Sequence, residues 1–81
     1  MRFVLAQPGI ASVTVFDILG RLVYRWEKRN AAAWVHTVHW EGTDTEGKSV
    51  GAGLYLYRIE VRKFQYGSPV FVSTKKMVMI G

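Results

Sequence analysis

Cysteine is absent from this chain of 81 residues, and proline and long apolar runs are scarce. Without cysteine, no disulfide bond or thiolate metal site can form. The sequence therefore does not indicate whether the protein resides in an oxidising or a reducing compartment. The chain has only two prolines and no apolar run near the roughly 18 residues of a membrane-spanning helix. The apolar run at 3–6 is also too short for the core of a signal peptide. Stability must therefore come from the apolar core of one small domain.

Basic residues outnumber acidic ones. The chain has eleven Lys and Arg and six Asp and Glu, which give a net charge of +5. Such an excess favours acidic partners such as nucleic acid, lipopolysaccharide or anionic lipid, although charges of this kind most often solvate exposed strand faces. Basic residues are interleaved with Phe64, Tyr66 and Phe71, but no recognised nucleic-acid signature accompanies them. We therefore expect no nucleic-acid partner and no membrane span.

Apolar and aromatic residues are abundant and alternate with the period of strands. Val13 and Val15 alternate with their neighbours in this way, and the same pattern places Leu22 and Tyr24 on one face of the next strand and Val23 on the other. The pattern predicts strands at 2–6, 10–18, 22–26, 34–40, 54–64 and 70–80, with a polar connection at 27–30. Turn signals every 8–12 residues or so are typical of a sandwich or barrel. We predict an all-β fold, an antiparallel β-sandwich of about seven strands.

Aspartate and glycine mark the predicted turns. Asp17 lies three residues before Gly20, and Asp44 lies three residues before Gly47. At this spacing a carboxylate can accept hydrogen bonds from the amides of its own turn, and glycine supplies the backbone freedom that a reversal needs. We assign a structural role in turns to Asp17, Gly20, Gly42, Asp44, Gly47 and Gly53.

Residues that could perform catalysis or hold a metal form no recognised pattern. His36 and His39 are three apart on a predicted strand, so their side chains point to opposite faces. Glu41, Asp44 and Glu46 resemble a calcium loop only faintly, because the ligand ladder and the closing glutamate are missing. No nucleophile elbow, phosphate-binding loop or pair of carboxylates is present. We therefore expect no enzyme, no metal and no cofactor.

The aromatic residues leave open a carbohydrate-binding function. Trp26, Trp34 and Trp40 could form, with Tyr24, a flat platform for a sugar. Aromatic residues in so small a domain more often pack in the core. A carbohydrate-binding accessory module therefore stands as an alternative and not as the leading interpretation.

Five sequence blocks resemble one family when they are read together. They are FDILGRLV at 16–23, HTVHWEG at 36–42, DTEGK at 44–48, GLYLYR at 53–58 and KKMVMI at 75–80. In this order they resemble the C-terminal sorting domain of the type IX secretion system (type A), which is similar to the immunoglobulin-like domain of the flagellar hook-capping protein. The chain departs from the family pattern at Phe16, where tyrosine is usual, at Glu41, where aspartate is usual, and at Gly81, where a basic residue is common.

The resemblance implies that residues 1–81 form an immunoglobulin-like β-sandwich at the end of a larger secreted protein of a Bacteroidetes-type bacterium. Domains of this family direct the cargo that precedes them through the outer-membrane type IX translocon. A sortase-like protease then usually removes the domain and joins the cargo to an anionic lipopolysaccharide. The expected localisation is the periplasm in transit, and then the cell surface or the medium.

The apolar ending with its two lysines is our candidate for recognition by the translocon. Such a segment can be bound independently of the cargo, by strand addition or by a charged contact. The residues assigned to this role are Lys75, Lys76, Met77, Val78 and Ile80. The same segment is expected to be the last strand of the fold. A structural immunoglobulin-like spacer, as in a hook-capping protein, is therefore a second alternative function.

Overall fold

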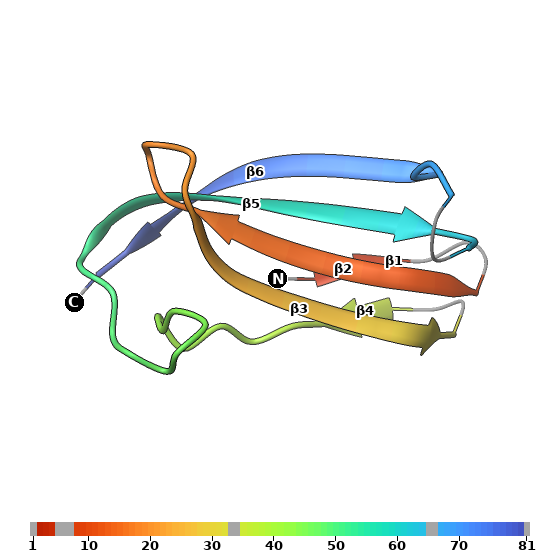
Figure 1. Ribbon diagram of the computed structural model, residues 1–81, viewed down its shortest axis with the longest axis horizontal. Helices are drawn as coiled ribbons and strands as arrows, with labels where there is room; N and C mark the ends of the chain where they lie inside the picture. Colours follow the sequence, from red (N-terminus) through yellow and green to blue (C-terminus); the bar gives the residue numbers. More distant parts are fainter. Residues whose placement is uncertain (1, 5–7, 33–34, 65–66, 81) are drawn as a thin grey trace.

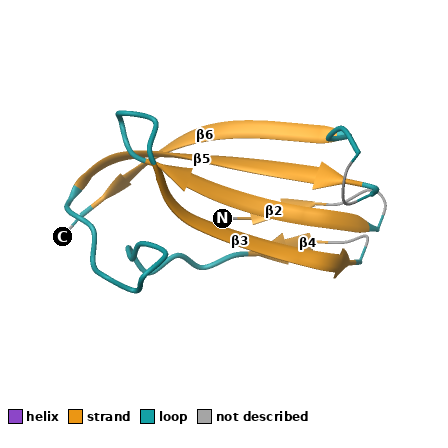
Figure 2. Ribbon diagram, viewed as in Figure 1, coloured by secondary structure: helices purple, strands orange, loops and turns teal. Residues whose placement is uncertain are grey.

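The computed structural model describes residues 2–4, 8–32, 35–64 and 67–80 (Figure 1). In this part of the chain there are six strands and no helix (Figure 2). The strands are β1 (Arg2–Val4), β2 (Gly9–Phe16), β3 (Leu22–Ala31), β4 (Val35–Thr37), β5 (Gly53–Arg62) and β6 (Phe71–Met79). The predicted all-β class is confirmed, whereas the sandwich of seven strands stays a prediction.

Four long strands form one antiparallel sheet in the order β3-β2-β5-β6. Strands β1 and β4 form a separate antiparallel pair, in which Phe3 lies opposite His36. In the large sheet β2 and β5 are central, and β3 and β6 form the two edges (Figure 1). The turn that joins β2 to β3 lies at the same end of this sheet as the end of β6 (Figure 1).

One face of the large sheet, here called the inner face, carries the core. The alternation of β2 places Ala11, Val13 and Val15 on this face, and all three are fully buried. The segment that follows β4 covers the inner face, because Val38 belongs to the same buried cluster as Val13, and Trp40 to the same cluster as Val15. The core therefore lies between the large sheet and this segment.

On the opposite, outer face of the large sheet, charged side chains cover the region around Ser12 and Thr14. Ser12 and Thr14 point to this face, yet they are only 1% and 7% exposed. Their cross-strand neighbours on β3 and β5 are four charged residues: Arg25, Glu27, Arg58 and Glu60. Arg25 pairs with Glu27 on β3, and Arg58 pairs with Glu60 on β5. The long stems of these side chains can cover the short side chains of Ser12 and Thr14, which lie between the two strands.

Strand β3 differs from its prediction in two ways. The stretch at 27–30, predicted as a polar connection, continues the strand to Ala31, because polar side chains are compatible with an exposed edge strand. A register shift between Val15 and Phe16 leaves Val23 outside the ladder with β2. This β-bulge turns Val23 into the core, whereas Leu22 is 55% exposed, so the predicted faces are wrong at this point.

Of the described residues in the strand predicted at 34–40, only Val35–Thr37 pair with β1, so the strand ends earlier than predicted. Val38 and Trp40 leave the ladder and still lie buried, so the alternation in this stretch reflects burial and not pairing. The strands predicted at 10–18, 54–64 and 70–80 agree with β2, β5 and β6 to within one or two residues. Trp34 and Tyr66 lie outside the described residues.

Candidate functional site

Strand β6 carries most of the predicted recognition residues and forms an edge of the large sheet. It pairs with β5 from Phe71, opposite Val61, to Met79, opposite Gly53, without a register shift. No strand of the described chain pairs with its other side. Alternate backbone N–H and C=O groups of β6 therefore point to a free edge.

Most of the predicted recognition residues are exposed to solvent. The exposed ones are Lys75, Lys76, Val78 and Ile80. Val78 and Ile80 are 70% and 86% exposed, as are other large apolar side chains such as Phe64 at 74%. On an edge strand these exposed side chains are accessible to another protein.

Met77 differs from the other predicted recognition residues, because it is half-buried. It lies opposite Tyr55 in the ladder, and together with Met79 it packs against the second buried cluster, which consists of Val15, Val23, Trp40 and Tyr55. Met79 also lies against Gly42, where an added Cβ would be 3.0 Å from the Met79 Cε. An unbranched thioether suits such an irregular surface. The structure thus gives Met77 a packing contact and leaves the neighbouring residues free to contact a partner.

The two lysines of β6 have no acidic neighbour across the strands. Lys75 lies opposite Tyr57, and Lys76 lies opposite Leu56. Neither lysine takes part in an ion pair with any described residue. Because adjacent residues of a strand point to opposite faces, one ammonium group lies on each face of the sheet. The middle of β6 therefore presents uncompensated positive charge on both faces.

Four apolar side chains that were not predicted to contact a partner form a patch with Val78 on the outer face. Leu54 lies opposite Val78, Leu56 opposite Phe16, and Phe16 opposite Leu22, so these five side chains share the outer face. Leu22 and Leu54 are 55% and 42% exposed. Leu54 and Leu56 alternate with Tyr55 and therefore share the face of Arg58 and Glu60, but nothing in the pattern marks these two leucines as a binding surface.

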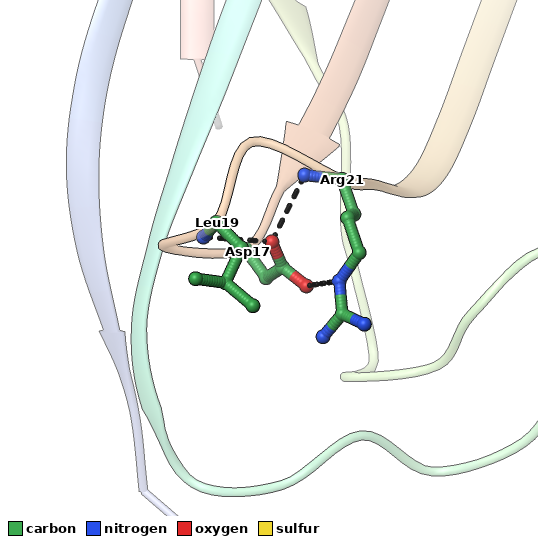
Figure 3. Close-up of polar contacts among 3 residues, drawn as sticks. All are labelled: Asp17, Leu19 and Arg21. Atoms are coloured by element: carbon green, nitrogen blue, oxygen red, sulfur yellow. Dashed lines mark hydrogen bonds and ion pairs between the residues drawn. The ribbon is translucent and has the colours of Figure 1, made fainter.

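The β2–β3 turn is held by the carboxylate of Asp17 (Figure 3). Its Oδ1 accepts hydrogen bonds from the backbone N–H groups of Leu19 and Arg21, both at 2.9 Å, and its Oδ2 accepts one from Arg21 Nε at 2.8 Å. The bond from the Arg21 amide, assisted by the Arg21 side chain and the Leu19 amide, lowers the pKa of Asp17, and desolvation opposes this shift only in part. Gly20 closes the turn with a φ of 80°. The carboxylate is fully engaged in turn geometry.

The turn at 44–48 repeats this geometry. Asp44 Oδ1 accepts hydrogen bonds from the N–H groups of Glu46 and Lys48, both at 2.9 Å. The N–H of Gly47 donates to the Asp44 carbonyl at 3.0 Å, and the φ of this glycine is 81°. The carboxylate that a calcium loop would use is thus bound to backbone amides. The described residues contain no group of three His, Cys, Asp or Glu that could hold a metal ion.

Trp40 fills the core and is not part of an exposed aromatic platform. It is 9% exposed, its Nε1 donates to the Thr43 carbonyl at 2.7 Å, and its ring packs edge-on against Tyr55 at 5.4 Å between centroids. The Tyr55 hydroxyl donates in turn to the Gly51 carbonyl at 2.6 Å. Trp26 is half-buried against the first core cluster. The sugar platform suggested by the sequence is therefore wrong with respect to Trp40.

The two histidines lie apart from β6 in the sequence and the topology. His36 belongs to β4, and its Nε2 lies 2.7 Å from the Ala32 carbonyl oxygen, whereas His39 is exposed. The part of the chain that the structure describes contains no helix long and apolar enough to cross a membrane.

Comparison with known proteins gives no match: no protein-family model, no curated protein and no solved structure corresponds to this chain. Evidence on function consequently comes from the sequence blocks and from the geometry of β6.

Proposed function

We propose that this chain is a non-catalytic C-terminal sorting signal, which directs a larger cargo protein across the outer membrane by the type IX secretion system. The observation that carries the proposal is that the KKMVMI block falls on the exposed edge strand β6 and the residue after it. A translocon that exports many cargoes needs a surface feature that does not depend on the cargo. An edge strand with exposed lysines and apolar side chains supplies such a feature.

The partners, the localisation and the finer fold belong to the same proposal. The partners are the outer-membrane translocon and a sortase-like protease, and the cargo precedes the chain. The protein passes through the periplasm and ends at the cell surface or in the medium. An immunoglobulin-like sandwich is the proposed fold, and an antiparallel sheet of four strands with one buried face supports it.

The test is a fusion of residues 1–81 to the C-terminus of a periplasmic reporter in a type IX-competent bacterium. We expect the reporter at the cell surface, and we expect the double substitution Lys75→Ala/Lys76→Ala to reduce surface delivery strongly. The double substitution Lys28→Ala/Arg29→Ala is the matched control, because it removes the same charge from exposed residues of the opposite edge strand, β3. The control should deliver the reporter normally.

Deletion of residues 75–81 is a second variant, and its folding must be checked because Met77 and Met79 pack against the core. Urea denaturation of the purified domain provides this check. Normal surface delivery by a folded domain without residues 75–81 would contradict the assignment of recognition to the tail. A reporter that stays in the periplasm with the unchanged domain would contradict the sorting function itself.

A structural immunoglobulin-like spacer is the second candidate, and one observation favours it. Four of the five sequence blocks supply turns and core: the blocks at 16–23 and 44–48 form the two aspartate turns, the block at 36–42 buries Trp40, and the block at 53–58 begins β5. A purely structural module needs these features as much as a sorting domain does. The same fusion separates the two functions, because a spacer would leave the reporter in the periplasm.

A further inference from the structure

We propose that the free edge of β6 binds an extended acidic segment of a partner protein by β-strand addition. This inference deepens the sorting function and rests on it for the identity of the partner as part of the translocon. Three properties of β6 support strand addition: its regular pairing, its unpaired positive charge and its exposed apolar side chains.

The two edges of the large sheet differ in regularity. The ladder between β3 and β2 contains two register shifts, one between Gly9 and Ala11 and one between Val15 and Phe16. Such bulges twist an edge strand and hinder the addition of another strand. β6, in contrast, runs for nine residues without a register shift and contains neither proline nor glycine. It therefore offers an uninterrupted row of free backbone donors and acceptors.

The two lysines of β6 determine which occupant this edge favours. Lys75 and Lys76 are exposed, form no ion pair with a described residue and point to opposite faces of the sheet. A strand added to β6 would place two adjacent side chains directly opposite them, at the distance where cross-strand charge pairs act. Carboxylates there would be attracted and basic residues repelled. The net charge of +5 adds a longer-range attraction for an acidic segment.

A second copy of this chain fits the edge less well. Antiparallel pairing of β6 with its own copy over the whole strand would place Lys75 opposite Lys75. Like charges directly opposite one another are destabilising, and lysines on edge strands commonly prevent self-association. The side chains that favour an acidic strand thus disfavour a dimer through the same edge.

Apolar side chains on either side of the lysines supply contact area. Phe71 and Val72 at the start of β6 are 49% and 52% exposed, and Val78 near its end is 70% exposed. β-Branched or aromatic residues on an incoming strand would bury these side chains. The expected partner segment therefore has a central acidic pair and apolar, β-branched flanks.

The test uses the complete chain and three synthetic peptides of about ten residues, a length that matches a typical long strand. The first peptide alternates valine and threonine around two central glutamates. The second carries two lysines in place of the glutamates. The third is the acidic peptide with N-methyl groups on alternate backbone nitrogens, which removes ladder donors and keeps the charge. We expect only the first to bind in fluorescence anisotropy and to slow hydrogen exchange at alternate amides of β6.

Charge reversal tests the role of the lysines. Lys75→Glu/Lys76→Glu should weaken binding of the acidic peptide by about tenfold or more and should allow the lysine peptide to bind. Lys28→Glu/Arg29→Glu on β3 changes the net charge by the same amount at the other edge of the sheet. This control should change the affinity for the acidic peptide by no more than about threefold, because charges beyond a Debye length are largely screened.

Two results would overturn strand addition. One is equal binding of the N-methylated and unmethylated acidic peptides, and the other is equal loss of affinity in the two charge-reversed variants. The reporter fusion keeps this proposal separate from the sorting function. If export requires Lys75 and Lys76 but the acidic peptide does not bind, strand addition alone fails. If the peptide binds as expected but the fusion stays in the periplasm, the sorting function alone fails.

Discussion

Met79, at the end of the last strand, lies against Gly42 in the segment that follows Trp40. A Cβ at Gly42 would lie 3.0 Å from the Cε and 3.2 Å from the Sδ of Met79. Gly42 also has a φ of 73°, a conformation that glycine adopts without the steric cost paid by other residues. The segment after Trp40 and the end of β6 are thus fitted to each other, so two sequence blocks that are distant in the chain are structurally linked.

The first prediction concerns this contact. Gly42→Ala should lower the free energy of unfolding by about 1–3 kcal/mol, because it adds left-handed strain and crowds Met79. Gly20→Ala should cost only the strain, since Gly20 has a φ of 80° and no atom within 4 Å of an added Cβ. Gly51→Ala should be nearly neutral, because its Cβ would meet open space at an ordinary φ. Urea denaturation measures all three variants.

A double-mutant cycle tests whether Met79 is responsible for the difference between the first two variants. In a Met79→Ala background the contact is gone, so Gly42→Ala should cost no more than Gly20→Ala. An unchanged excess cost of Gly42→Ala in that background would show that the Gly42–Met79 contact does not matter.

The second prediction concerns the hydrogen bond at the centre of the second core cluster. Tyr55→Phe removes the bond from the hydroxyl to the Gly51 carbonyl at 2.6 Å but keeps the ring that packs against Trp40. The expected loss of stability is about 1 kcal/mol. Tyr24→Phe is the control, because the half-buried Tyr24 has no hydrogen bond to a described residue. Equal unfolding midpoints for the two variants in urea, followed by circular dichroism, would contradict a role for the Tyr55 hydroxyl.

Much of the fold follows from local pattern. The alternation along β5 puts Tyr55, Ile59 and Val61 on one face and Arg58 on the other, and in the structure the first three are buried and Arg58 lies on the opposite face. The aspartate turns are equally local, since Asp17 bonds to residues two, three and four positions further along. Such features depend on few residues, so a single sequence contains the information that determines them.

Other features depend on contacts between distant segments, and the sequence alone does not reveal them. The β-bulge that buries Val23 arises from the register of β3 against β2. Met77 is half-buried and its neighbour Val78 is exposed, because β6 pairs with β5 in a register that packs Met77 against the cluster of Trp40. Both tail residues are apolar, so composition does not distinguish a packing contact from a residue available to a partner. The last strand was therefore predicted correctly, but which of its residues are exposed required the structure.

The third prediction is a dependence of stability on acid pH. The pKa of Asp17 is lowered in the folded state, chiefly by the Arg21 amide, so the unfolded state binds the proton more readily. The stability that this carboxylate contributes is present above its unfolded pKa, at about pH 4, and is lost as the pH falls through the lower folded value. Asp17→Asn keeps an acceptor for the amides but removes the charge. Its unfolding temperature should be lower at neutral pH and should fall less below about pH 4.

Thermal unfolding followed by circular dichroism from neutral to strongly acid pH measures this difference. Glu41→Gln is the control, because Glu41 is exposed and forms no hydrogen bond or ion pair with a described residue. Its profile should parallel that of the unchanged protein. Parallel profiles for Asp17→Asn and the unchanged protein below about pH 4 would contradict the role of the Asp17 charge.

The last prediction compares two valines with opposite environments. Val13 is fully buried in the first core cluster, whereas Val78 on β6 is 70% exposed. Val13→Ala should cost about 2 kcal/mol of stability, from lost burial and the cavity left behind, and Val78→Ala should change stability by less than about 0.5 kcal/mol. If β6 is the recognition strand, the order reverses in the reporter fusion. Val78→Ala should then reduce surface delivery at unchanged stability, whereas Val13→Ala should reduce it only as far as the domain unfolds. Normal delivery by Val78→Ala would remove this side chain from the recognition surface.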